Sequence, residues 1–302
     1  MELSLTKIIL IGLFIAAAVY VHKRGRVRHG FWRQVSDHST FLAPINALLY
    51  LTSRVPNRPY IDVAEFPELK PLQENWTLIR DEALTLENKI RASDQYNDAG
   101  FNSFFRTGWK RFYLFWYGVS HPSAEQCCPQ TVQLLRSIPG IKAAMFAELP
   151  PGGKLVRHRD PYAGSIRYHL GLVTPGADSC FIEVDGERHS WHDGQPVMFD
   201  ETFIHYAENK SDTNRLILFC DVERPLKFGW ATAFNRWFSK NVLSAAASPN
   251  DEGDATGGIN RAFAHVYQVR LKAKALKKRN RTLYYVLKWS IFAGVALLIL
   301  AA

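Results

Sequence analysis

The sequence predicts a mainly β core with flanking helices and a transmembrane helix at each terminus. The core is indicated by residues 142–224, where short apolar runs alternate with turn signals such as Pro175-Gly176 and Asp193-Gly194. Several short strands at this spacing are typical of a sandwich or a barrel. The terminal helices are indicated by long apolar runs at both ends of the chain, each close to the roughly 20 residues that a spanning helix needs.

The N-terminal transmembrane helix is predicted over residues 1–21. From Leu3 to Val21 the only charged residue is Lys7. A cleaved signal peptide is the alternative, because Ala16-Ala17-Ala18 resembles a small-residue cleavage site. The basic cluster follows the apolar run, however, and this order is a stop-transfer pattern that places the residues after Val21 in the cytoplasm. The cluster consists of Lys23, Arg24, Arg26 and Arg28.

The C-terminal transmembrane helix is predicted over residues 283–302, in which Lys288 is the only charged residue. Tyr284, Tyr285 and Trp289 lie where an aromatic belt would form. A buried core helix is the alternative. The basic segment from Arg270 to Arg281 precedes this run, so the basic flanks of both predicted helices are expected in the cytoplasm. Each of their charges is expected to strengthen binding to anionic lipid headgroups by about 1 kcal/mol.

The net charge of +9 is concentrated in these two basic clusters. Their eleven positive charges exceed the net charge, so the rest of the chain is slightly negative. Bulk charge therefore gives no support to nucleic-acid binding. The four cysteines contain no C-x-x-C pair and are expected to be reduced thiols of a cytosolic domain: Cys127, Cys128, Cys180 and Cys220.

Between the predicted membrane helices, the chain divides into a basic and helical connecting region at 22–95, a β domain at 96–244, and a linker with a polybasic helix at 245–282. Helices are expected around Phe41–Leu51, at 72–93 and at Pro129–Ser137. An aromatic strand is expected at 109–118. Aromatic residues from Phe101 to Tyr117 could line an apolar groove, although most of them would suit a core. Asp185-Gly186 indicates a hairpin turn.

The candidate chemistry lies in His158, Asp160 and His205, followed by Arg215. Two imidazoles and one carboxylate, with the first pair spaced H-x-D, are the ligand set of the facial triad that holds non-haem Fe(II). On a strand, the H-x-D spacing places both side chains on one face. Arg215 offers a fixed cationic fork for the far carboxylate of a dicarboxylic cosubstrate.

The region from about Trp109 to Pro225 resembles the aspartyl/asparaginyl β-hydroxylase superfamily. The resemblance is carried by Arg167-Tyr168-His169-Leu170-Gly171-Leu172, by Phe199-Asp200-Glu201-Thr202-Phe203-Ile204-His205 and by Asn214-Arg215-Leu216. It implies a double-stranded β-helix, or jelly roll, and a dioxygenase that uses Fe(II), 2-oxoglutarate and O2. It also implies that His158 and His205 bind iron, and that Arg215, Arg167 and His169 hold the cosubstrate.

Asp160 departs from the animal peptide hydroxylases of this superfamily, which resemble this chain but have glycine at that position. Asp160 either binds the metal as the third ligand or supports a ligand without binding the metal. The H-x-D geometry favours a ligand. A serine by which those enzymes contact 2-oxoglutarate aligns near Ala147, so that contact is expected to be absent or replaced.

Within the superfamily, the length and the two predicted anchors resemble bacterial lipid A hydroxylases. That resemblance implies 2-hydroxylation of a secondary fatty acyl chain of lipid A, at the cytoplasmic face of the bacterial inner membrane. The expected partners are lipid A or a related lipid and anionic membrane lipids, with no nucleic acid and no obligate protein partner. Two alternatives stay open: a peptide aspartyl/asparaginyl β-hydroxylase, and a non-catalytic scaffold tethered to the membrane.

Overall fold

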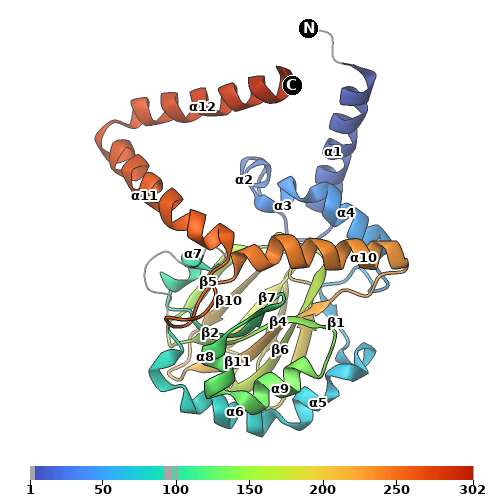
Figure 1. Cartoon of the computed structure of the whole chain (residues 1–302), viewed down its shortest axis with the longest axis vertical. Coiled ribbons are helices and arrows are strands. Elements are labelled where there is room, and N and C mark those ends of the chain that lie inside the picture. Colours follow the sequence, from blue (N-terminus) through green and yellow to red (C-terminus); the bar gives the residue numbers. More distant parts are fainter. Residues whose placement is uncertain (1–3, 92–97, 99–100, 302) are drawn as a thin grey trace.

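Two antiparallel β-sheets form the centre of the computed structural model, which describes residues 4–91, 98 and 101–301 (Figure 1). The larger sheet has the order β1-β9-β6-β11-β4-β2-β3, and the smaller has the order β5-β10-β7-β8. The first strands are β1 (Tyr60–Ile61), β2 (Lys110–Trp116), β3 (Val119–Ser120), β4 (Ile141–Leu149), β5 (Lys154–His158) and β6 (Ser165–Val173). The later strands are β7 (Cys180–Val184), β8 (Glu187–Ser190), β9 (Pro196–Phe199), β10 (His205–Asn209) and β11 (Arg215–Glu223).

The eight strands from β4 to β11 form a jelly roll, as the sequence predicted. Along the chain, β4, β6, β9 and β11 join the larger sheet, whereas β5, β7, β8 and β10 join the smaller one. The chain therefore passes back and forth between two sheets whose facing side chains form a shared core, which is the double-stranded β-helix. The predicted hairpin is present, because Asp185 and Gly186 both have positive φ, at 52° and 89°, as a type I′ turn requires.

Helices cover the outer face of the larger sheet (Figure 1). They are α5 (Lys70–Glu74), α6 (Trp76–Thr85) and α9 (Pro129–Arg136), and their apolar side chains join those of the sheet in one core cluster. Because both faces of β6 and β11 are covered, these strands are buried along almost their whole length. The cavity described below lies in the other layer, between the two sheets.

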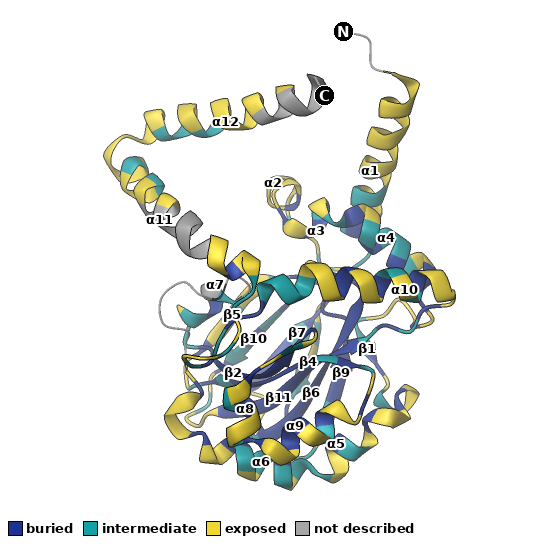
Figure 2. Cartoon of the chain, in the orientation of Figure 1, coloured by how far each residue is buried: buried dark blue, intermediate teal, exposed yellow. Residues whose placement is uncertain are grey.

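The N-terminal helices lie together at one end of the β domain (Figure 2). They are α1 (Leu5–Lys23), α2 (Phe31–Val35), α3 (His38–Phe41) and α4 (Ala43–Thr52). Among the described residues, α1 is the one helix that is both long enough and apolar enough to cross a membrane, with a mean hydropathy of 2.0. Only 6% of its apolar window is buried in the protein, so α1 is not a core helix.

The remaining helices are α7 (Asn102–Phe105), α8 (Pro122–Cys127), α10 (Gly229–Phe238), α11 (Gly258–Arg279) and α12 (Arg281–Ala301). The predicted span at 283–302 is helical in α12 as far as Ala301, but several of its side chains lie outside the described residues. A second transmembrane helix therefore stays a prediction.

Three expectations differ from the structure. The helix expected at 72–93 is interrupted at Asn75, whose side-chain amide donates to Pro71 O at 2.8 Å and so competes with the helical bonds. It ends at Thr85, and residues 92 and 93 lie outside the described residues. The connecting region also supplies β1 to the larger sheet. Residues 245–258 are not a free linker, because Asn250 is buried and donates to Tyr113 O at 2.8 Å.

Candidate metal and cosubstrate site

The two candidate histidine ligands lie opposite each other on neighbouring strands. His158 is the last residue of β5, His205 is the first residue of β10, and the antiparallel register pairs them directly. Their ring centroids are 4.2 Å apart. Each Nδ1 donates to a backbone carbonyl two residues earlier, at 2.7 Å to Val156 O and 3.0 Å to Phe203 O. These bonds leave both Nε2 atoms unprotonated and available to a metal ion.

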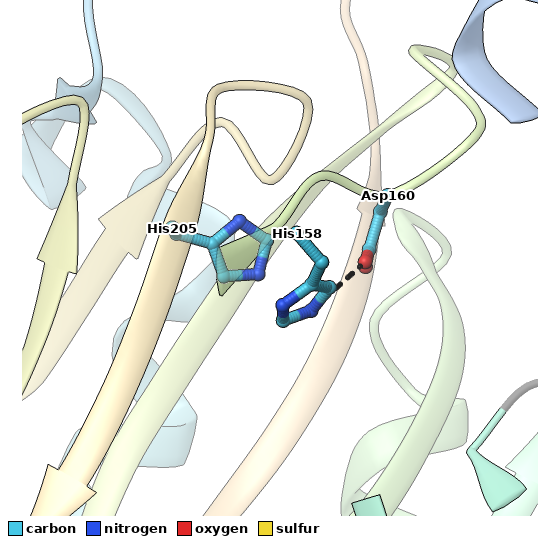
Figure 3. Close-up of side chains that lie close together, drawn as sticks. All are labelled: His158, Asp160 and His205. Carbon is cyan, nitrogen blue, oxygen red and sulfur yellow. Dashed lines mark ion pairs between the residues drawn. The ribbon is translucent and has the colours of Figure 1, made fainter. Parts of the chain in front are cut away.

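Asp160 lies beside the two histidines, in the loop that follows β5 (Figure 3). The expectation that H-x-D lies within one strand is therefore wrong, because β5 ends at His158. The loop is held instead by a bond from Asp160 N to Glu201 O at 2.9 Å. Asp160 Oδ1 is 3.6 Å from His158 Nε2, and the ligand atoms of the three residues lie within 4.8 Å of one another.

Burial and charge hold the three residues in the protonation states that a cation needs. Burial, together with the neighbouring His205, lowers the pKa of His158 to about 3. Burial also lowers the pKa of His205. Burial opposes ionisation of Asp160, but the charge of Arg167 outweighs it and holds the pKa of that carboxyl below its ordinary value. Two neutral imidazoles and a carboxylate fit a divalent metal ion.

Arg167 orients Asp160. Its guanidinium donates to Asp160 Oδ2 at 2.7 Å and to Asp221 Oδ1 at 2.8 Å, and its Nε lies 3.9 Å from Glu201. The predicted role of Arg167 in holding the cosubstrate stays a prediction, but the structure shows this contact with the candidate ligand. Because Oδ2 is engaged by Arg167, Oδ1 is the oxygen that faces His158.

Arg215 and His169 line the same cavity as the three candidate ligands. The Arg215 guanidinium lies 4.4 Å from the centre of the Trp191 ring and is buried, and no described carboxylate forms an ion pair with it. Its Nε and Nη2, both ring nitrogens of His169 and Nε1 of Trp191 are buried without a hydrogen-bond partner among the described residues. Burial lowers the pKa of Arg215 to about 10.

This group of unpartnered donors fits an anionic ligand. A buried cation without a counter-ion is costly, as are buried polar atoms that make no hydrogen bond. A guanidinium presents paired donors that match a carboxylate. The residues present therefore fit a dicarboxylate such as 2-oxoglutarate, and Arg215 would pair with one of its carboxylates.

Another part of the cavity lining is aromatic and apolar. It is lined by Phe101, Phe104, Trp109 and Leu155, and the Phe104 ring lies 4.7 Å from the ring of His158. The expectation for the aromatic stretch therefore holds at its beginning, whereas Tyr113 further along is fully buried in the core. No sequence pattern identified Trp191, whose ring lies 4.4 Å from the Arg215 guanidinium.

Comparison with known proteins supports the same site. Residues 73–225 match the aspartyl/asparaginyl β-hydroxylase family. The chain belongs to this family. The matched range contains all the candidate metal and cosubstrate residues: His158, Asp160, Arg167, His169, His205 and Arg215.

Two proteins similar to this chain have names that describe different hydroxylases. An ornithine lipid ester-linked acyl 2-hydroxylase of Rhizobium tropici is 33% identical over 179 residues, which cover 58% of this chain and 64% of that protein. The aspartyl/asparaginyl β-hydroxylase of Homo sapiens is 30% identical over 162 residues, which cover 52% of this chain and 21% of that protein. The chain thus spans less than two thirds of either relative.

Proposed function

We propose that this β-hydroxylase family member is an Fe(II)- and 2-oxoglutarate-dependent dioxygenase that hydroxylates an ester-linked acyl chain of a membrane lipid at its 2-position. The observation that carries the proposal is the shared cavity. It places the unpartnered donors of Arg215, His169 and Trp191 beside the cluster of His158, Asp160 and His205. A metal centre and a dicarboxylate site in one enclosure are the two requirements of this enzyme class.

The chain's own residues bind, orient and exclude water. His158, Asp160 and His205 would hold Fe(II), which together with O2 and 2-oxoglutarate supplies the oxidising chemistry. Arg215 would pair with the distal carboxylate of 2-oxoglutarate, while Arg167 holds Asp160 in place. The aromatic walls keep bulk water away from the reacting atoms, and this strengthens the charge interactions inside the cavity.

An acyl chain suits the apolar part of the cavity better than a peptide aspartate or asparagine. The four lining residues Phe101, Phe104, Trp109 and Leu155 offer aromatic and aliphatic surface in that part. A carboxylate or amide side chain placed there would need hydrogen-bonding groups to replace its water, whereas methylene groups gain by leaving water. The name of the Rhizobium tropici relative describes an acyl 2-hydroxylase, which supports the same choice.

The membrane helix supports a lipid substrate. With α1 in the bilayer and the basic cluster after it in the cytoplasm, the cavity would face the cytoplasmic leaflet of a bacterial inner membrane. A second span at 283–302 would tether the domain at both ends. We propose a secondary acyl chain of lipid A as the substrate, and ornithine lipid is the competing lipid.

The test is mass spectrometry of lipid and protein from a bacterial host that lacks the activity and expresses the full chain. The proposal predicts a lipid A acyl chain that is heavier by one oxygen atom, in cells with the wild-type chain or with Arg188→Ala, a change at an exposed arginine. His205→Ala should abolish the product. Oxygen only in ornithine lipid would exclude lipid A, and oxygen only in protein Asp or Asn would exclude a lipid. A purified chain that binds neither Fe(II) nor 2-oxoglutarate would favour the scaffold.

A further inference from the structure

We propose that α2 and α3, residues 31–41, form a membrane seat that lies in the headgroup region of the bilayer beside the end of α1. The inference rests on the proposed membrane span in α1. It goes beyond that span, because it gives the cytoplasmic domain a second, non-spanning contact with lipid.

The membrane seat exposes all its apolar side chains and buries three of its polar ones, while Arg33, Ser36 and His38 are exposed. Four of its apolar side chains are exposed: Phe31 by 69%, Trp32 by 81%, Val35 by 51% and Phe41 by 69%. Three of its polar side chains are buried: Gln34, Asp37 and Ser39. Water-facing segments bury apolar residues and expose polar ones, so this arrangement needs an apolar or interfacial environment on its outer side.

One hydrogen bond joins the membrane seat to the last turn of α1. His22 Nδ1, near the last turn of α1, is 3.2 Å from the side-chain oxygen of Gln34. The Asp37 side chain accepts a bond from Ser39 N at 3.0 Å and lies 3.8 Å from His29 Nε2. The exposed aromatic side chains therefore stay at the level where α1 ends at Lys23.

Two further contacts join the membrane seat and α1 to the loop that carries Asp160. His38 Nε2 is 2.7 Å from the carbonyl oxygen of Arg159, and the Arg159 guanidinium donates to Val21 O at 3.1 Å. The end of α1, the membrane seat and the residue before Asp160 thus form one bonded unit. Insertion of the seat would set the height of the metal site above the lipid.

A bilayer is the occupant that fits this surface. The membrane seat adjoins α1, whose apolar run is exposed over most of its length (Figure 2). Tryptophan is enriched where membrane helices meet water, and aromatic side chains next to basic ones are typical of segments that lie in the interface. Arg33 and Lys23 supply the basic charges here.

The test measures the depth of single nitroxide labels by electron paramagnetic resonance. The full chain carries Cys127→Ser, because the other three cysteines are buried, and is reconstituted in phosphatidylethanolamine–phosphatidylglycerol vesicles. Labels are placed by Phe31→Cys in the seat, by Leu13→Cys in α1 and by Leu84→Cys in α6. Leu84 is a matched control, because it is an exposed apolar side chain on the helical layer at the far end of the domain (Figure 1).

We expect the labels at positions 31 and 13 to collide more with O2, and less with a water-soluble nickel chelate, than the label at 84. A label at 31 that behaves like the one at 84, while the label at 13 is in lipid, would overturn the membrane seat and leave the span intact. A label at 13 that behaves like the one at 84 would overturn both. Spin–spin broadening at position 31 that vanishes on dilution with unlabelled protein would assign the patch to a second copy and overturn the inference. No outcome depends on hydroxylase activity.

Discussion

The guanidinium of Arg24 forms a buried ion pair with the carboxylate of Asp200, so the end of α1 is joined to the segment that leads to His205. Arg224 pairs with the same carboxylate at 2.7 Å. The Arg24 guanidinium also lies between the rings of Tyr50 and Phe203, at 3.9 and 4.1 Å. Arg24 was expected to belong to a lipid-binding basic cluster, but it is enclosed in the protein and links the membrane helix to the metal site.

Replacing Arg24 should destabilise the protein more than replacing a neighbouring arginine. Arg224 stays paired with Asp200, so the loss comes from the buried charge-assisted hydrogen bond of Arg24 and from the space it leaves beside Tyr50 and Phe203, and it should be about 1.5 to 3 kcal/mol. Arg26 is the matched control, because its side chain is 79% exposed in its pair with Glu187 and such pairs contribute about 1 kcal/mol or less. Denaturant unfolding of Arg24→Ala and Arg26→Ala in detergent measures both, and equal losses would show that the Arg24 link is not structural.

Replacing Arg215 should separate stability from cosubstrate binding. Arg215→Met removes a buried cation that lacks a counter-ion, so we expect the melting temperature of the ligand-free protein to stay the same or rise. The stabilisation by 2-oxoglutarate in the presence of Fe(II) should disappear. The control Arg111→Met should lower the melting temperature, because Arg111 is equally buried but is paired with Asp98 at 3.1 Å. A marked loss of stability in Arg215→Met would mean that Arg215 has a structural partner.

The role of Asp160 can be decided by metal affinity. Loss of a group that only supports a ligand typically weakens metal binding by about 10- to 100-fold. If Asp160 is itself a ligand, Asp160→Gly should weaken Co(II) binding by more than about 100-fold. Absorption spectroscopy of the bound Co(II) measures this affinity without any turnover. His158→Ala should do the same, and His189→Ala, which lies outside the cavity lining, should have little effect. If His158→Ala strongly weakens Co(II) binding but Asp160→Gly has only a small effect, Asp160 supports a ligand and does not bind the metal itself.

The metal-free protein should lose stability in mild acid. The pKa of His158 is about 3 in the folded chain because the side chain is buried, against an ordinary value of about 6.5 in the unfolded chain. As the pH falls below about 6.5, His158 binds a proton in the unfolded state but stays unprotonated in the folded state. The free energy of unfolding therefore falls by up to about 1.4 kcal/mol per pH unit for this group. His205 acts in the same direction.

Urea unfolding of the metal-free chain between about pH 6.5 and about pH 5 measures that slope. His158→Asn lacks the titrating group, so its stability should depend less on pH than that of the wild type. Parallel dependences in the two proteins would show that His158 is protonated to the same extent in both states.

The strands were predictable because their buried positions leave a strong apolar pattern. The turn signals Pro175-Gly176 and Asp193-Gly194 lie between strands, the first before β7 and the second before β9. The break at Asn75 was not predictable from apolar period, because it depends on a side chain bonding to its own backbone. The burial of Asn250 depends on contacts with β2, which is 137 residues away along the chain at Tyr113.

For the site, residue spacing and resemblance identified the three residues that the structure brings together, His158, Asp160 and His205. Spacing could not show that Asp160 lies beyond the strand, because that position depends on a backbone bond to Glu201. It also could not show that Arg24 is buried, because a basic residue after a membrane helix has the same sequence pattern whether it faces lipid or a buried carboxylate.

The most direct test of the central claim follows the oxygen atoms. The purified full chain would be supplied with Fe(II), 2-oxoglutarate, isotopically labelled O2 and lipid A in mixed micelles, with His205→Ala as the control. We expect one labelled oxygen at carbon 2 of an acyl chain for each 2-oxoglutarate converted to succinate, and neither product with the variant. Acyl hydroxylation that needs no 2-oxoglutarate, or 2-oxoglutarate consumption that leaves every acyl chain unlabelled, would contradict the account.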